Sequence, residues 1–282
     1  ICCRIVFRVA EANIVHYYTK YSNNVRGSMK AAQINEYGHA DAVKVVDIDK
    51  PSVKPNTVLV EVHAASINPF DTMVREGYMQ EMIPLELPVT LGGDIAGVVA
   101  EVGDGVEGLA VGDKVYGQAN VVAGNSGAFA EFAVTAAGQV GKMPADISFE
   151  DAASLPLVGV SALQGLTEHM QLEKGQKLFI HGGAGGIGSA AIQIAKSKGV
   201  YVATTATGEG IKYVESLGAD EVIDYKNEDF ADKLHDFDAV FELAGGKEFD
   251  KTLIAFYSIN NWLIDILYFF PIYFLLINGL KK

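Results

Sequence analysis

One glycine pattern constrains the fold of this chain more than any other feature. Residues 183–188 read Gly-Ala-Gly-Gly-Ile-Gly, a G-x-G-x-x-G sequence. They directly follow a short apolar strand pattern at 177–181 and open a helical pattern at 188–198. In that setting the backbone turns tightly and presents free N–H groups, at the positive end of the helix dipole, to a phosphate. The segment therefore predicts a phosphate loop, the alternative being an ordinary glycine-rich turn.

Each glycine of this loop has an expected task. Gly183 permits the tight turn, Gly185 lets the backbone approach a pyrophosphate, and Gly188 lets the helix pack close to the strand. The predicted cofactor contacts are Gly183, Ala184, Gly185, Gly186, Ile187 and Gly188.

Strand and helix patterns alternate around the loop. Apolar runs at 200–205, 221–223 and 238–243 predict three further strands, and apolar residues at helical spacing predict helices at 152–170 and 212–217. This alternation is typical of βαβ units and a parallel sheet.

The preceding part of the chain has a different pattern. Residues 29–145 carry short strand patterns separated by glycine-rich turns, which predict an all-β barrel or sandwich. The expected fold class is therefore mixed, with a β domain at 29–150 and an α/β domain at 151–253.

Composition excludes several classes. Hydrophobic residues make up 49% of the 282 residues and charged residues 20%, so the chain can bury a core and is not intrinsically disordered. The net charge of -13 repels phosphate backbones, which argues against a nucleic-acid partner. Both cysteines, Cys2 and Cys3, precede residue 29, so residues 29–253 contain no disulfide and no thiolate metal ligand.

The residues after the second α/β strand bear on cofactor choice. NAD sites place an acidic residue about 20 positions after the first glycine of the loop, where it binds the ribose 2′-hydroxyl. This chain has no acid at 204–207, although Glu209 lies close by. Hydroxyls and a cation suit a 2′-phosphate, and Thr205, Thr207, Lys212 and Tyr213 supply them. We therefore expect NADP(H), while Lys212 could equally be a solvated lysine on a helix face.

The two ends of the chain differ from its middle. Residues 1–28 are basic and show no clear strand or helix period, which suits upstream sequence before Met29 or an organelle transit segment. Residues 254–280 carry a single charge, Asp265, and eight aromatic residues. That run is long enough to cross a bilayer, but Asp265 and Pro271 and the abrupt change of composition favour an aberrant tail such as a frame change. A membrane partner is expected only if this tail is genuine.

Several separate motifs then point to one family. Residues 29–253 resemble the zinc-free quinone oxidoreductase (zeta-crystallin-like) and enone reductase branch of the medium-chain dehydrogenase/reductase superfamily. The matching segments, in order, are 66–71, 91–99, 111–117, 181–188 and 217–225. The resemblance implies a GroES-like β domain followed by a Rossmann domain, reduction of a quinone or enone by NADPH, and a homo-oligomer.

The resemblance also implies roles for single residues. Asn68 would contact the nicotinamide or substrate, or else form only a structural Asn-Pro turn. Asp71 would order the site, or else cap a helix over 72–76. Ser161 would place a hydroxyl near the nicotinamide, or else be an ordinary small residue in a packed helix. Ala244 and Gly245 would let the backbone pass close to the cofactor, as would Gly246.

This chain departs from its relatives in the residues at the zinc-ligand positions and in the number of strands that its Rossmann pattern predicts. Zinc-dependent members carry Cys near position 68 and His near 93, where this chain has Asn68 and Gly93, so we expect no metal site. Relatives continue with two more Rossmann strands where the pattern here ends near Leu253. The expected function is cytoplasmic, zinc-independent reduction of quinones or enones. The alternative is a truncated, non-enzymatic remnant that keeps the nucleotide-binding loop.

Overall fold

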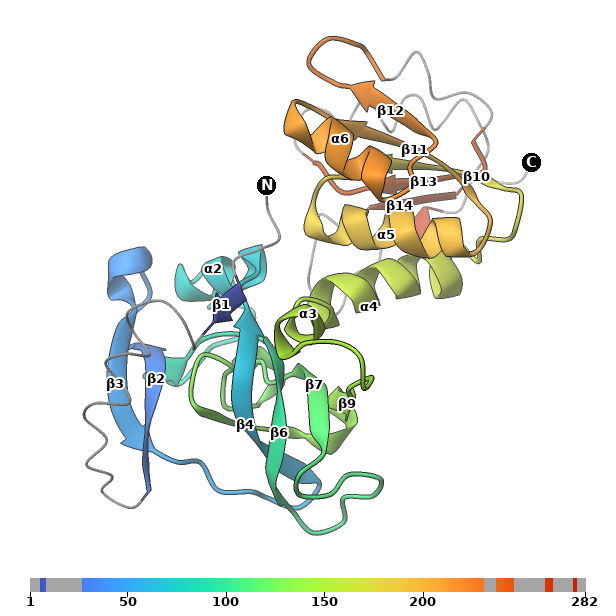
Figure 1. The fold of residues 1–282 in the computed structure, drawn as a ribbon. Helices are drawn as coiled ribbons and strands as arrows, with labels where there is room; N and C mark the ends of the chain where they lie inside the picture. Colours follow the sequence, from blue (N-terminus) through green and yellow to red (C-terminus); the bar gives the residue numbers. More distant parts are fainter. Residues whose placement is uncertain (1–5, 9–26, 231–236, 246–261, 266–275, 278–282) are drawn as a thin grey trace. The chain divides into compact units, whose positions relative to one another are not determined.

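The computed structural model of the chain describes residues 6–8, 27–230, 237–245, 262–265 and 276–277. The chain divides into two compact units (Figure 1). Ile5–Leu157 form the first, called the β unit below, and Val158–Lys282 with the first four residues form the second, called the α/β unit.

Two antiparallel sheets make up the β unit. The larger has the strand order β1-β4-β6-β7-β9 with β8 also paired to β4, and the smaller has the order β3-β2-β5. The strands are β1 (Val6–Arg8), β2 (Ser28–Ile34), β3 (Lys44–Asp49), β4 (Thr57–Ser66), β5 (Val89–Thr90), β6 (Asp94–Val102), β7 (Lys114–Gln118), β8 (Phe132–Ala136) and β9 (Val140–Lys142). The helical segments are η1 (Ala40–Ala42), α2 (Pro69–Arg75), η2 (Val121–Ala123), η3 (Ala137–Gln139) and α3 (Phe149–Ala153).

Alternating side chains build the core of the β unit. Val58, Val60 and Val62 follow one another at every second position of β4, and they pack in one cluster with Ile95 and Val99 of β6. This spacing puts all three valines on the same face of the strand. The expected β domain is confirmed.

Within residues 1–28, the structure describes residues 6–8 and 27–28. Val6–Arg8 form β1, which pairs antiparallel with β4 between Ser66 and Ala64, and β2 begins at Ser28. The sequence shows no clear strand period here, and the interpretation of residues 1–28 as upstream or transit sequence stays a prediction. A three-residue strand added to an existing sheet is held by backbone hydrogen bonds and needs no side-chain period.

A single sheet forms the centre of the α/β unit. Its order is β12-β11-β10-β13-β14-β15, parallel throughout except for the last pair. The strands are β10 (Lys177–His181), β11 (Tyr201–Ala206), β12 (Glu221–Asp224), β13 (Ala239–Glu242), β14 (Trp262–Asp265) and β15 (Leu276–Ile277). The helices are α5 (Gly186–Ser197) and α6 (Glu209–Ser216), and α4 (Pro156–Gln164) and the π-helical turn η4 (Gly165–His169) precede the sheet. This is the order of a doubly wound Rossmann sheet, as expected.

The central strand β10 is covered on both faces. Leu178 and Ile180 pack into one cluster with α5, while Phe179 points to the opposite face and packs with Phe230 and Phe237. Burial of both faces explains why β10 reads as a continuous apolar run rather than an alternating one.

Two expectations for the α/β unit are corrected. The helix expected at 152–170 is divided into α3, α4 and η4, because Pro156 cannot continue α3 and begins a new helix. The sheet was expected to stop after four strands, yet Trp262–Asp265 pairs parallel with β13 as a fifth. A short apolar, β-branched or aromatic run suits a buried strand as well as a membrane segment, so its composition alone did not distinguish the two.

Most of the apolar tail, 254–261, 266–275 and 278–282, lies outside the described residues, as does Gly246. Among the residues that are described, none of the helices combines the length and apolar character needed to span a bilayer.

Candidate functional site

The phosphate loop lies at the carboxyl end of β10, where the strand order of the sheet reverses between β10 and β13 (Figure 1). Doubly wound sheets bind ligands at this switch point. The first hydrogen bond of α5 runs from Ser189 N–H to Gly185 O. Among the described residues, the N–H groups of Gly186, Ile187 and Gly188 therefore find no acceptor. These three donors at the start of a helix fit a pyrophosphate.

Close packing explains two of the glycines in the loop. A Cβ atom on Gly188 would lie 2.4 Å from the carbonyl oxygen of Gly182, and one on Gly183 would lie 2.1 Å from Thr204 Oγ1. A Cβ on Gly185 would meet only Gly182 O, at 3.3 Å, so its outer side is open to a ligand. The tight turn itself falls on Gly182, whose φ is +90°, and not on Gly183 as expected.

The predicted 2′-phosphate residues separate into two groups. Lys212 and Tyr213 are exposed on α6. Thr205 is buried, and its hydroxyl accepts the Gly182 N–H at 2.9 Å. Thr205 therefore supports the phosphate loop from inside, which corrects its expected role as a contact of the 2′-phosphate. A polar residue late in β11 was assigned to the ligand without knowing which way its side chain points.

Thr207 is half-buried and has a partner that the sequence reading missed. Its hydroxyl donates to Asp224 at the end of β12, and this hydrogen bond is the main cause that lowers the pKa of the Asp224 carboxyl. Because β11 and β12 are parallel neighbours, their carboxyl ends share one edge of the sheet. That adjacency is the signal that could have found Asp224.

The chain after β13 forms a second loop at the switch point. Gly245 has φ +68° and is buried, whereas Ala244 is exposed. Their N–H groups both donate to Glu242 Oε1, at 2.8 Å from Ala244 and 3.1 Å from Gly245. The structure thus brings the two predicted residues Ala244 and Gly245 to the same sheet edge as the phosphate loop.

Ser161 is buried in α4 at 9% exposure. It interacts with at least one other group of the protein. Its hydroxyl contact with a nicotinamide stays a prediction.

Asn68 lies in a buried polar network of the β unit. Its side-chain amide donates to Asp94 Oδ2 at 2.9 Å and to Ser66 Oγ at 3.3 Å. Asp94 also accepts from Ser66 Oγ, from Gln118 Nε2 and from the Leu157 N–H. Both amide hydrogens of Asn68 therefore have acceptors, and Asn68 and Asp71 form a capping box at the start of α2. The side-chain oxygen of Asn68 has two lone pairs, so it is the atom that Asn68 can still offer to a ligand.

Asp71 holds the start of α2. The helix begins at Pro69 with Asn68 as its N-cap, and the Asp71 carboxylate accepts the Asn68 N–H at 2.7 Å. Asp71 is thus the third helical residue, which corrects the helix start expected at residue 72. Pro69 was read as part of a turn, although proline is common at a first helical position.

The two buried carboxyls of this network are hard to ionise. Burial raises the pKa of Asp71 to about 7, against the lowering effect of the Asn68 N–H and with a further rise from Asp94. Burial also raises the pKa of Asp94, although four hydrogen-bond donors oppose it. The network therefore contains a carboxyl group that can change its protonation near neutral pH.

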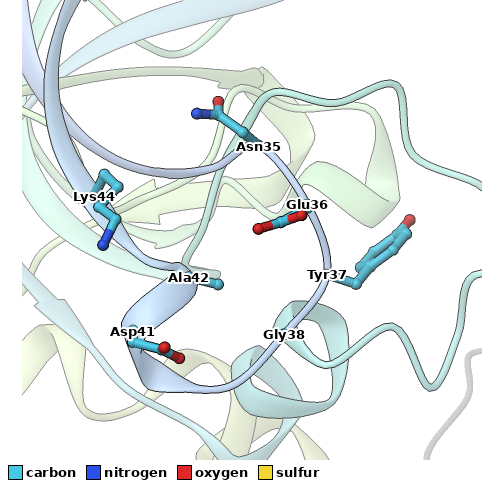
Figure 2. Close-up of a pocket in the computed structure, with 7 residues that line it drawn as sticks. All are labelled: Asn35, Glu36, Tyr37, Gly38, Asp41, Ala42 and Lys44. Atoms are coloured by element: carbon cyan, nitrogen blue, oxygen red, sulfur yellow. The ribbon is translucent and has the colours of Figure 1, made fainter.

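A separate pocket of about 430 Å³ opens on the β unit (Figure 2). It lies in the turn that joins β2 to β3 and is lined by Asn35, Glu36, Tyr37, Gly38, Asp41, Ala42 and Lys44. The turn is fastened to the C-terminal end of α2, because Gly38 N–H donates to Arg75 O. None of the predicted site residues lines this pocket.

Metal ligands do not gather in the parts of the chain that the structure describes. No group of three or more His, Cys, Asp or Glu side chains is placed there to hold an ion. The absence of zinc stays a prediction, which rests on Asn68 and Gly93 at the positions of the zinc ligands in relatives.

Two family models match the two units. The model of the alcohol dehydrogenase GroES-like domain matches residues 54–145, and that of the zinc-binding dehydrogenases matches residues 186–256.

Curated relatives cover most of the chain. It is 36% identical over 248 residues to a chloroplast envelope quinone oxidoreductase homolog of Arabidopsis thaliana, across 84% of this chain and 74% of the relative. It is 37% identical to a 2-methylene-furan-3-one reductase of Solanum lycopersicum, across 82% of this chain and 61% of the relative. The human quinone oxidoreductase is 33% identical, across 80% and 69%. The chain thus spans between 61% and 74% of the length of these relatives.

Solved structures agree with these matches. The quinone oxidoreductase of Coxiella burnetii superposes with a TM-score of 0.74 at 35% identity, covering 81% of this chain and 72% of the other. A mycobacterial protein solved in complex with NADPH superposes with a TM-score of 0.73 at 32% identity, covering 83% and 73%. Together with the GroES-like β unit and the phosphate loop, these matches show that the chain belongs to the quinone oxidoreductase and enone reductase branch of the medium-chain dehydrogenase/reductase superfamily.

Proposed function

We propose that this chain is an NADPH-dependent, zinc-independent oxidoreductase that reduces quinones or α,β-unsaturated carbonyls. The observation that carries the proposal is the phosphate loop at the switch point of the sheet. Three of its N–H groups have no acceptor among the residues that the structure describes, and one side of Gly185 is open. The names of its relatives supply the reaction class, because they include quinone oxidoreductases and an NADPH-dependent alkenal/one oxidoreductase.

The residues present fit a bound dinucleotide. Gly185, Gly186, Ile187 and Gly188 would hold the pyrophosphate, and Lys212 would hold the 2′-phosphate. Ala244 and Gly245 would let the backbone pass close to the nicotinamide. NADPH, when bound, supplies the hydride.

Asn68 is the residue of the β unit that we assign to the ligand. Asp94 and Ser66 accept from its amide nitrogen, so the group that Asn68 can present to a ligand is the second lone pair of its side-chain oxygen. It would orient a donor such as the nicotinamide carboxamide or a ribose hydroxyl. The negative charge that develops on the substrate oxygen requires donors, which Asn68 in this orientation does not supply. Asp71 positions Asn68 by accepting its backbone N–H.

Domain roles, location and assembly belong to the same proposal. Residues 29–150 would form the substrate-side domain and residues 151–253 the cofactor domain. We place the enzyme in the cytoplasm as a homo-oligomer. Cell fractionation and analytical ultracentrifugation test these two statements independently of activity.

Cofactor titration tests the function most directly. The 282-residue chain is titrated with NADPH and NADH by nicotinamide fluorescence, and its oxidation of NADPH is then followed with a quinone and with an enone. Tighter binding of NADPH than of NADH and turnover of either substrate are expected. Equal affinity or a preference for NADH would contradict the cofactor assignment. Binding without turnover of any quinone or enone would contradict the assigned reaction.

A further inference from the structure

A buried, hydrogen-bonded pair of side chains joins the two central strands of the α/β unit at the switch point. His181 is the last residue of β10 and Glu242 the last of β13, and they are register partners in the parallel pairing of these strands. His181 Nδ1 lies 2.7 Å from Glu242 Oε2, and the two side chains are 3% and 0% exposed. A carboxylate is removed from water at this depth only when other groups satisfy it.

Glu242 uses its two oxygens for different tasks. Oε2 contacts the histidine, while Oε1 accepts the N–H groups of Ala244 and Gly245. The carboxyl group therefore determines the course of the loop that follows β13. Without it, two backbone donors of that loop would lose their acceptor.

His181 connects this arrangement to the phosphate loop. It immediately precedes Gly182, the positive-φ residue at which that loop turns. The backbones of the two loops pack together, since a Cβ on Gly182 would lie 3.6 Å from the nitrogen of Ala244. The His181 ring is itself held by Phe230, with ring centroids 4.5 Å apart. One side-chain pair thus fixes the starting points of both loops.

We propose that His181 and Glu242 are positioning residues that hold the phosphate loop and the Ala244–Gly245 loop in one binding-competent arrangement before NADPH arrives. Neither side chain needs to touch the cofactor, because the pair acts through the backbone of its neighbours. Preorganisation of this kind increases affinity by removing the entropic cost of ordering loops at the moment of binding. This inference rests on the proposed binding of NADPH.

Hydrogen exchange of the cofactor-free protein tests the first half of the proposal. The amides of Ala244 and Gly245 should exchange about 100-fold or more slowly than unstructured amides, because Glu242 accepts both. Exchange at the unprotected rate in the wild-type chain would overturn the proposal. This readout needs no variant and no enzymatic activity.

Variants of Glu242 test the second half. Glu242→Leu keeps an apolar side chain of comparable size but removes both acceptors, and it should weaken NADPH binding about tenfold or more while deprotecting the two amides. Glu242→Gln keeps Oε1 as an acceptor and can donate to the other tautomer of His181, so it should bind NADPH within about threefold of wild type. Glu221→Leu is the matched control, since Glu221 accepts a hydrogen bond from the Tyr201 hydroxyl at the opposite end of the same sheet.

The outcomes separate the two proposals. A folded Glu242→Leu protein, verified by circular dichroism, that binds NADPH like wild type would overturn the positioning role. The positioning role would also be overturned if Glu242→Gln weakened NADPH binding as much as Glu242→Leu. The same holds if Glu221→Leu weakened it equally, because either result would indicate a general loss of stability. Failure of the wild-type chain to bind NADPH would instead contradict the proposed function. If Glu242→Leu does not fold, the exchange measurement on the wild-type chain decides.

Discussion

The phosphate loop of the α/β unit and the Asn68 network of the β unit prepare a binding site by opposite means. The loop consists of backbone N–H groups and glycines within seven consecutive residues, 182–188. The network joins side chains from β4, α2, β6 and β7, and its most distant partner, the Leu157 N–H, lies 63 positions after Asp94. The comparison shows that a site made of backbone depends on the shape of one segment, whereas a site made of side chains depends on the whole sheet.

The two units also differ in the hydrogen-bond partners of their buried carboxyl groups. In the network, Asp71 and Asp94 are buried with neutral hydrogen-bond donors as the partners that the structure gives them, and their pKa values rise. At the switch point, Glu242 is paired with His181. The raised pKa of Asp71 predicts that the stability of the β unit depends on pH near neutrality. The close packing of Gly183 and Gly188 predicts that the phosphate loop is sensitive to added side-chain atoms.

The largest expected effect is steric and belongs to the loop. Gly188→Ala places a methyl group 2.4 Å from the carbonyl oxygen of Gly182, which cannot move without distorting the loop. We expect a loss of about 3–5 kcal/mol in the free energy of unfolding, or no measurable NADPH binding in protein that folds. Gly138→Ala is the control, because no atom lies within 4 Å of its added Cβ. If Gly188→Ala were as stable as wild type and bound NADPH equally well, the loop would not depend on close backbone packing as the comparison states.

A second prediction concerns the pH response of the network. Because the folded pKa of Asp71 is about 7 and its unfolded pKa is ordinary, the folded state binds more protons between the two values. Stability should therefore fall as pH rises from about 4 to about 7 and stay low above that range. Asp71→Asn keeps an acceptor for the Asn68 N–H but removes the charge, so it should be more stable than wild type by about 2–3 kcal/mol at pH 8.

Urea denaturation from pH 4 to pH 8 measures this response. Asp71→Asn should reduce the slope of stability against pH. The control is Asp113→Asn. The Lys142 hydrogen bond lowers the pKa of the Asp113 carboxyl, so removing this carboxyl should leave the fall in stability between pH 4 and pH 7 unchanged. A wild-type stability that rises across this interval would contradict the assignment of the buried acid.

The same contrast explains what the sequence could predict. The phosphate loop was predicted because its strand, glycines and helix are contiguous, and the strand at 177–181 was predicted with its observed bounds. The side-chain network could not be predicted, because Asn68, Asp94 and Gln118 meet only after three strands and a helix have paired and packed. The hydrogen bond from Asn68 to Asp94 was not foreseen.

Errors in the predicted fold have local physical causes. Thr205 looked available for a phosphate because periodicity does not show that its hydroxyl turns inward to Gly182. The strand at Trp262–Asp265 was missed because parallel pairing with β13 provides its order, and no glycine or helix pattern precedes it. Local patterns thus predict elements well and predict long-range partners poorly.

A smaller effect is expected from the exposed cation beside the loop. Lys212→Ala should weaken NADPH binding by about 1–2 kcal/mol and leave NADH binding nearly unchanged, because only NADPH carries the 2′-phosphate. Lys198→Ala is the matched control, since Lys198 is exposed at the other end of α5. Equal weakening of both cofactors, or of neither, would show that Lys212 is a solvated surface lysine.

The smallest expected effect is that of metal removal, for which we expect no change. Asn68 donates to Asp94 from the position where zinc-dependent relatives carry Cys, and Gly93 replaces their His, so the carboxylate is surrounded by hydrogen-bond donors rather than by other ligands. Zinc requires about four nitrogen, sulfur or oxygen ligands, or three with water. The purified chain should contain no stoichiometric zinc by elemental analysis, and a chelator should alter neither NADPH binding nor turnover. One zinc ion per chain, lost together with activity on chelation, would show that the Asn68 network is a metal site and would remove the contrast between the two regions.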